Sequence, residues 1–173
     1  MSGNIGRLND HLVPEHLLTE HEKNKRVKQM PGVATDMIIE YVEHGKEGLI
    51  LIERKFEPYG IALAGGYLEP ELWGQENAIK EAGEETKLEM IVSSVKFHGV
   101  YDDPLRDPRR RLVALVYYGQ GVGQYKGDDD AKKAFFVPHE KVAEMIEDPT
   151  IWAFKDHRFM IKDYYRKKEE GRL

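Results

Sequence analysis

The chain has 173 residues, enough for one domain with a substantial hydrophobic core. Its formal net charge is −5 and it has no long basic run, which argues against non-specific nucleic-acid binding. It has no cysteine, which excludes disulfides, iron–sulfur clusters and thiolate zinc sites, and it has no apolar run of membrane-spanning length. We therefore expect a soluble, cytoplasmic protein that contacts neither membrane nor DNA.

Residues 1–30 are polar and carry scattered histidine and glutamate side chains, with a short helix expected near residues 14–25. These side chains could bind a metal, but the pattern favours a solvated arm or a helix that contacts a second copy in a homodimer. The pair Pro31-Gly32 then interrupts the chain. We predict an N-terminal arm over residues 1–30 and a globular domain over residues 31–173.

Residues 33–41 and 48–52 are rich in β-branched and aliphatic side chains and are separated by a turn-like segment. This pattern predicts two adjacent strands or a hairpin. Arg54 follows the second strand, and we predict that it binds substrate. A short strand over residues 61–64 leads to Gly65-Gly66, where glycine would permit close approach of the backbone to a ligand.

A helix is predicted from Trp73 to Lys87, and it carries Glu81 and Glu85 one turn apart with Glu84 beside them. Three neighbouring carboxylates repel one another unless a cation lies among them. Mg²⁺ or Mn²⁺, which prefer oxygen ligands, are the natural partners, and a solvated acidic helix face is the alternative. Gly83 lies inside this helix, and we expect a neighbour to need the space that it leaves.

Residues 65–90 resemble the Nudix box, the family pattern G-x5-E-x7-R-E-U-x-E-E-x-G-U in which U is aliphatic. Without gaps, the first glycine of the pattern falls on Gly66. The paired and preceding glutamates of the pattern fall on Glu81, Glu84 and Glu85.

Three positions depart from the pattern: Leu72 replaces the first glutamate, Lys80 the arginine and Lys87 the last glycine. The family implies that the first two form an ion pair that steadies the catalytic glutamates, so their joint loss reads as one coupled change. Lysine is a point charge, so a new anchor would be less rigid. Glu76, four residues before Lys80, could be its new partner.

The resemblance implies metal-assisted attack of water on a diphosphate. We predict that Glu81, Glu84 and Glu85 are catalytic and bind Mg²⁺ or Mn²⁺, with Glu84 either a third ligand or a support for the metal-bound water. The family also implies a backbone carbonyl ligand at Gly65 or Gly66, and Gly66 is predicted to contact substrate. The number of metal ions stays open.

Two further strands are predicted over residues 91–101 and 111–118. The loop between them has the form Tyr-x-x-Pro-x-Arg-Asp-Pro-Arg and resembles Nudix enzymes that act on ADP-ribose and related sugar nucleotides. Arg106 and Arg109 are predicted to bind substrate phosphates through their guanidinium groups, and Arg110 and Arg111 offer the same chemistry. In the alternative, these arginines pair with aspartates of the same loop.

Residues 119–126 are rich in glycine and glutamine and precede an acidic turn at Asp128, Asp129 and Asp130. An aspartate there could hold a further metal ion, but a solvated turn is favoured. A strand is predicted over residues 134–138 and helices over residues 139–147 and 154–168. The last helix is expected to place five side chains in the core: Phe154, Phe159, Ile161, Tyr164 and Tyr165.

The order of elements predicts the α/β class, and the resemblance, which covers residues 33–165, implies the Nudix fold, an α/β/α sandwich with a mixed β-sheet. It implies a pyrophosphohydrolase, with ADP-ribose as leading substrate and AMP and ribose 5-phosphate as products. Relatives also act on dinucleoside polyphosphates, NADH, oxidised nucleotides and capped RNA. A nucleotide-binding or regulatory protein with weak or no activity is the alternative. Candidates to stack the base are Phe56, Tyr59 and Tyr101.

Overall fold

The structure is a computed structural model that describes residues 30–107, 109–126 and 132–173. The predicted role of the arm in dimer contact concerns residues almost wholly outside the described ranges. The acidic turn at Asp128, Asp129 and Asp130 also lies outside them. One compact unit spans Gly32–Leu173.

The described residues form eight strands, three α-helices and one short 3₁₀ helix, Val92–Ser94. The strands are β1 (Gly32–Glu43), β2 (Lys46–Arg54), β3 (Gly60–Ala62), β4 (Ala64–Tyr67), β5 (Glu89–Met90), β6 (Lys96–Tyr101), β7 (Leu112–Val122) and β8 (Lys132–Pro138). The helices are α2 (Gly74–Thr86), α3 (His139–Glu147) and α4 (His157–Glu169).

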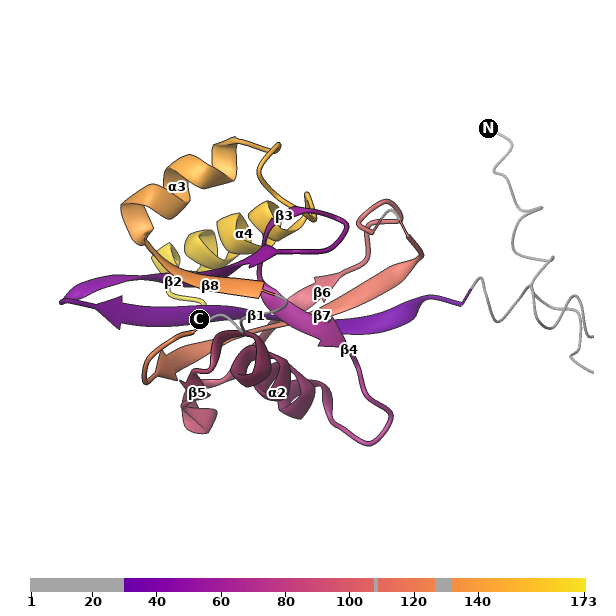
Figure 1. Cartoon of the computed structure of the whole chain (residues 1–173), viewed down its shortest axis with the longest axis horizontal. Coiled ribbons are helices and arrows are strands. Elements are labelled where there is room, and N and C mark those ends of the chain that lie inside the picture. Colours follow the sequence, from indigo (N-terminus) through magenta and orange to yellow (C-terminus); the bar gives the residue numbers. More distant parts are fainter. Residues whose placement is uncertain (1–29, 108, 127–131) are drawn as a thin grey trace, which may run out of the picture. The chain divides into compact units, whose positions relative to one another are not determined.

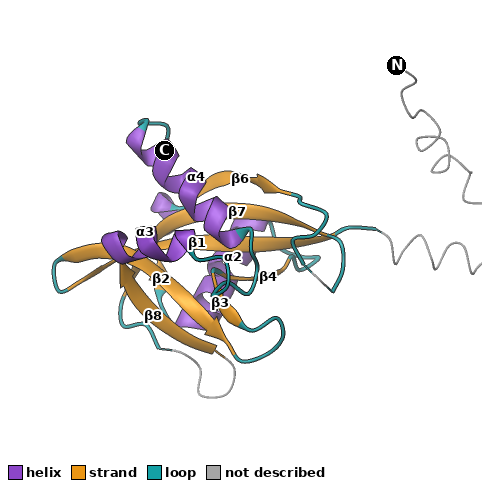
Figure 2. Cartoon of the chain, turned by 90° about the horizontal axis from the view of Figure 1, so that it is seen from above, coloured by secondary structure: helices purple, strands orange, loops and turns teal. Residues whose placement is uncertain are grey.

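The strands form one mixed sheet with β1 at its centre. β1 runs parallel to β7 and antiparallel to β2 and β4, and every other pairing is antiparallel. Figures 1 and 2 show α3 and α4 on one side of the sheet and α2 on the other. The predicted α/β/α sandwich with a mixed sheet is confirmed.

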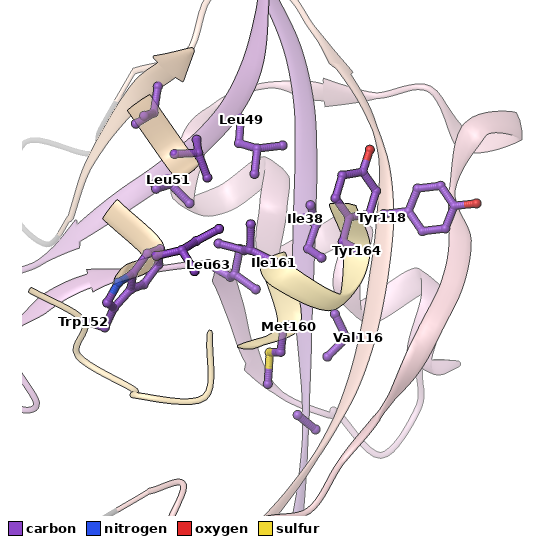
Figure 3. Packing of buried hydrophobic residues seen from close by; sticks show 14 residues of the cluster. Ile38, Leu49, Leu51, Leu63, Val116, Tyr118, Trp152, Met160, Ile161 and Tyr164 are labelled. Carbon is purple, nitrogen blue, oxygen red and sulfur yellow. The ribbon is translucent and has the colours of Figure 1, made fainter. Parts of the chain in front are cut away.

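Strands β1 and β2 are buried on both faces of the sheet, so their side chains alternate between two hydrophobic cores. Ile38, Leu49 and Leu51 pack on the side of α3 and α4. Figure 3 shows this core, with Met160, Ile161 and Tyr164 among its members. The intervening residues of β1 and β2 pack on the side of α2.

The predicted hairpin is confirmed as β1 and β2, joined by the two residues His44 and Gly45. Both have positive φ, 48° and 78° respectively. Positive φ at both central positions is what a type I′ turn requires, and this turn suits the twist of a tight hairpin.

Four predicted boundaries are wrong. The stretch 61–64 is divided between β3, which ends at Ala62, and β4, which begins at Ala64 and contains Gly65-Gly66. The stretch 91–101 begins with the 3₁₀ helix and becomes strand only at Lys96. β7 continues through the glycine-rich segment to Val122, because Gly121 lets the strand pass close to Ile39 and Leu88. The last helix begins at His157, three residues later than predicted.

Gly83 does not serve the spatial role that we expected. A Cβ built there would lie 3.5 Å from the Leu88 carbonyl oxygen, an ordinary van der Waals contact. Gly83→Ala should therefore raise the free energy of unfolding by about 0.5–1 kcal/mol, since alanine is the better helix former. Urea unfolding of both proteins checks this, and a destabilised variant would mean that the helix needs the glycine after all.

Candidate active site

Helix α2 presents two carboxylates to strand β4. The Glu85 side chain is buried, and its Oε2 accepts a hydrogen bond from the Gly65 N–H at 3.0 Å. One turn earlier, the Glu81 carboxylate lies against Gly66, where a Cβ would come within 2.4 Å of Oε2. Glycine at position 66 therefore makes room for a carboxylate beside the strand.

A cavity of about 400 Å³ opens beside these carboxylates. Strands β1, β2 and β4, helix α2, the loop before β7 and the start of α4 all contribute to its walls. It brings together all of the predicted site residues except Glu84: Arg54, Gly65, Gly66, Glu81, Glu85, Arg106 and Arg109.

Glu84 is not among the residues that line the cavity, and 59% of its side chain is exposed. Its Oε2 lies 2.9 Å from the Lys80 ammonium, which is also 3.1 Å from Glu69 Oε1 and 3.9 Å from Glu81 Oε1. Hydrogen bonds to Glu84, and then to Glu69, raise the pKa of Lys80. Lys80 therefore connects the helix to the loop that follows β4.

The partner that we predicted for Lys80 has another role. Glu76 Oε2 accepts the backbone N–H of Trp73 at 3.0 Å and so satisfies a donor at the start of α2. The expected pair of Glu76 with Lys80 is wrong, and Glu69 is the loop carboxylate that Lys80 contacts.

Arg54 and Arg109 come together over one aromatic ring that lines the cavity. Their guanidinium carbons lie 5.1 Å and 5.8 Å from the centre of the Phe154 ring. Burial, and then the nearby charge of Arg109, lower the pKa of Arg54. Arg54 donates to the Pro58 carbonyl at 2.9 Å, and among the described residues no carboxylate lies within ion-pairing distance of it.

Arg109 is held by a neighbour in its own loop. Its Nε and Nη2 lie 3.0 Å and 2.7 Å from the two oxygens of Asp107. Burial opposes the charge of Asp107, but these hydrogen bonds outweigh it and lower the pKa of that carboxyl. The alternative of arginine–aspartate pairing thus describes Arg109 in part, although the residue still lines the cavity.

Arg106 lines the cavity but is almost wholly buried in a group of charged residues. Its Nε donates to Asp156 at 2.6 Å and its Nη2 to Asp36 at 3.0 Å. Burial opposes the charge on Arg106, but the two carboxylates outweigh it and raise the pKa of Arg106. His157 lies alongside, with Nε2 3.7 Å from Asp36 Oδ2, and burial lowers the pKa of His157 to about 3.

Sequence reasoning missed Asp36 and His157, although both line the cavity. The signal for Asp36 was available, because it is the one charged residue within the otherwise uncharged residues 33–39 of strand β1. His157 Nδ1 accepts the Leu63 N–H at 3.0 Å, so the neutral ring carries its proton on Nε2. No local pattern announces that pairing.

The aromatic residues at the cavity also differ from those expected. Tyr67 and Phe154 line it, and Arg110 lies over the Tyr67 ring at 5.4 Å. Phe154 also packs against the core on the side of α2, so its predicted core position is only partly right. Phe159 is half exposed. The three predicted stacking residues, Phe56, Tyr59 and Tyr101, are not among the lining residues.

The part of the cavity lined by Glu81 and Glu85, here called the acidic wall, suits a hard divalent cation. Across the described ranges, no three acidic or histidine side chains come close enough to enclose a metal ion. Glu81 and Glu85 nevertheless offer two oxygen ligands in one cavity. Mg²⁺ is commonly bound by one or two carboxylates together with waters and substrate phosphates, so this donor set fits it.

Comparison with known proteins places these features in context. The family model described as the NUDIX domain matches residues 30–159. An ADP-ribose pyrophosphatase of Methanocaldococcus jannaschii is 36% identical over 149 residues, which cover 84% of this chain and 80% of the relative.

Solved structures give the same fold. The NUDIX domain of Shewanella oneidensis NrtR, solved with ADP ribose, has a TM-score of 0.68 at 14% identity, covering 87% of this chain and 99% of that one. A MutT/nudix family protein from Enterococcus faecalis has a TM-score of 0.58 at 23% identity, covering 72% of this chain. This chain spans only 52% of the Enterococcus protein. None of the helices in the described ranges is long and apolar enough to cross a membrane.

Proposed function

Because this chain belongs to the NUDIX family, we propose that it is a metal-dependent pyrophosphohydrolase that converts ADP-ribose and water to AMP and ribose 5-phosphate. Support for the substrate comes from the curated relative, which is an ADP-ribose pyrophosphatase. Support for the reaction comes from one observation. A single cavity is lined both by the carboxylates Glu81 and Glu85 of α2 and by the guanidinium groups of Arg54 and Arg109 from other segments.

The acidic wall is the proposed metal site. Glu81 and Glu85 would hold Mg²⁺ or Mn²⁺, with the Gly65 carbonyl as a further ligand. When bound, such an ion neutralises phosphate charge and lowers the pKa of a bound water. Glu84 is proposed to support this wall through Lys80, which contacts both Glu84 and Glu81.

The part of the cavity lined by Arg54 and Arg109, here called the basic wall, is the proposed phosphate site. Arg54 is half-buried and has no ion-pair partner among the described residues, so an anion in the cavity would gain a charge-assisted hydrogen bond from it. Arg109 lies over the same ring and adds a second guanidinium. Arg106 is already held by Asp36 and Asp156. We therefore propose that it contributes to substrate binding only by shaping this part of the cavity, without a direct bond to phosphate.

The reaction itself is then a displacement at phosphorus. Water attacks one phosphorus of the diphosphate, the bridging P–O bond breaks, and the bridging oxygen leaves with the second phosphoryl group. The arginines fix the two phosphoryl groups, which turns an encounter into an oriented reaction. Gly66 lines the same cavity and is proposed to contact the diphosphate through its backbone, whereas a Cβ there would displace the Glu81 carboxylate.

The direct test is hydrolysis of a panel of nucleoside diphosphate derivatives by the full chain with Mg²⁺ or Mn²⁺. ADP-ribose should be cleaved fastest, with AMP and ribose 5-phosphate identified by mass spectrometry. Faster cleavage of another compound would keep the hydrolase and replace the substrate. Absence of metal-dependent cleavage for every compound would refute the proposed function.

Arg54→Met should raise KM for the substrate about tenfold to 100-fold, because it removes hydrogen bonds between a guanidinium and a phosphate. Steady-state kinetics measure this effect. Arg166→Met is the matched control, since Arg166 is on the exposed part of α4 and pairs with Asp163 and Glu170. An unchanged KM in Arg54→Met would remove Arg54 from the phosphate site.

A second candidate function is recognition of the nucleotide without cleavage. The altered box favours it, because Glu84 pairs with Lys80 and does not line the cavity. Binding of ADP-ribose measured by calorimetry, together with no turnover under the panel conditions, would favour this reading.

A homodimer also remains part of the proposal, and sedimentation of the full chain tests it.

A further inference from the structure

Asn77 is a fully buried polar residue in the first turns of helix α2. Its Nδ2 donates to Thr35 Oγ1 at 2.8 Å and to the Tyr67 carbonyl at 3.1 Å. Its Oδ1 accepts the Glu69 N–H at 3.0 Å. Both amide hydrogens and the amide oxygen are thus satisfied by three different segments.

These contacts show why an asparagine is found there. Asparagine forms helices less readily than alanine, and a buried amide is costly unless it is hydrogen-bonded. Neither the local helix nor the apolar core explains this residue. Its contacts instead join α2 to strand β1, to strand β4 and to the loop after β4.

Asn77 lies on the same face of α2 as the two acids of the cavity. Asn77, Glu81 and Glu85 follow one another at intervals of four residues. Strand β4 runs past this face in the opposite order, so that Asn77 contacts Tyr67, Glu81 lies against Gly66, and Glu85 accepts from Gly65. Fixing the first of these contacts sets the register of the other two.

We propose that Asn77 is a positioning residue that fixes helix α2 on strand β4 and so holds Glu81 and Glu85 at the cavity. The proposal rests on the proposed function, since those two acids are the proposed metal ligands. Glu69 strengthens the arrangement from the loop. Its backbone is bonded to Asn77, and its side chain lies 3.1 Å from Lys80, so two successive turns of the helix hold one loop residue.

The test is Asn77→Ala in the full chain, with three readouts. We expect kcat and Mn²⁺ affinity, the latter measured by electron paramagnetic resonance, each to fall about tenfold to 100-fold, as for other residues that orient metal ligands. KM should change much less, because Arg54 and Arg109 come from other segments. Hydrogen exchange at the Gly65 amide should quicken, since its partner Glu85 is displaced.

Two further variants separate positioning from general loss of stability. Thr35→Val removes one of the three contacts and should give a smaller loss of the same kind, which keeps the test open if Asn77→Ala does not fold. Ile146→Val lowers stability from helix α3, on the other side of the sheet, and should leave kcat, Mn²⁺ affinity and Gly65 exchange as in the wild type.

The outcomes distinguish this inference from the proposed function. Wild-type kcat, Mn²⁺ affinity and Gly65 exchange in Asn77→Ala would overturn the inference. It would also be overturned if Ile146→Val, with the same melting temperature as Asn77→Ala, lost as much kcat and Mn²⁺ affinity. If the wild type neither hydrolyses the panel nor binds Mn²⁺, the proposed function fails, and faster Gly65 exchange in Asn77→Ala alone still supports the positioning of the helix.

Discussion

Glu85→Gln should lower kcat for the best substrate at least about 100-fold, because a metal-assisted reaction loses several kcal/mol of transition-state stabilisation with a ligand. The substitution keeps an oxygen that can accept the Gly65 N–H, so the helix should stay in place. What changes is the charge of the cavity wall. Steady-state kinetics with Mg²⁺ and with Mn²⁺ measure the effect.

The neighbouring glutamates supply the comparison. Glu81→Gln should fall in the same range as Glu85→Gln, whereas Glu84→Gln should lose much less, since Glu84 is exposed and pairs with Lys80. Equal losses for all three would show that Glu84 turns into the cavity when metal binds. Full activity of Glu85→Gln would withdraw the proposed metal site.

Arg106→Ala should lower the free energy of unfolding by about 3–5 kcal/mol, because breaking a buried ion pair leaves its partners charged without compensation. Arg106 is only 6% exposed and is bonded to two carboxylates, which are themselves buried. Urea unfolding, followed by circular dichroism at a pH near 7, gives the difference from the wild type.

Arg106→Lys is the informative control for that experiment. Lysine keeps the charge but cannot reach both Asp36 and Asp156 with a planar fork. The free energy of unfolding of Arg106→Lys should therefore lie between those of the wild type and Arg106→Ala. If Arg106→Ala lowered the free energy of unfolding by under about 1 kcal/mol, the range typical of exposed pairs, the buried ion pairs of Arg106 would not stabilise the fold.

The elements that could be predicted depend on local pattern. The β1–β2 hairpin and helix α2 follow from alternation, turn residues and helical spacing, all of which lie within a few neighbouring residues. The positions of Glu81 and Glu85 one turn apart follow from the same periodicity. The direction of the Glu84 side chain did not follow. Successive helical residues point about 100° apart, so Glu84 faces away from Glu85, and the place of its side chain also depends on the contacts that Lys80 makes with Glu84 and Glu69.

The contacts that sequence reasoning missed join distant residues. Asn77 and Thr35 are 42 residues apart, and Arg106 and Asp36 are 70 apart. Thr35 and Asp36 are neighbours on β1 and, as in any strand, point to opposite faces. One therefore meets α2 and the other meets Arg106. Nothing in either local stretch specifies its partner, since that depends on how the strands and helices pack.

The two walls of the cavity come from separate pieces of chain. Glu81 and Glu85 belong to α2, whereas Arg54 is the last residue of β2, Arg109 lies in the loop before β7 and Phe154 in the segment before α4. None of these three segments carries Glu81 or Glu85, although Asp107, which holds Arg109, also lines the cavity. New preferences for the group beyond the diphosphate can thus arise by exchange of loops, with the hydrolytic helix inherited unchanged. The same separation makes these loops the natural region for redesigning substrate choice.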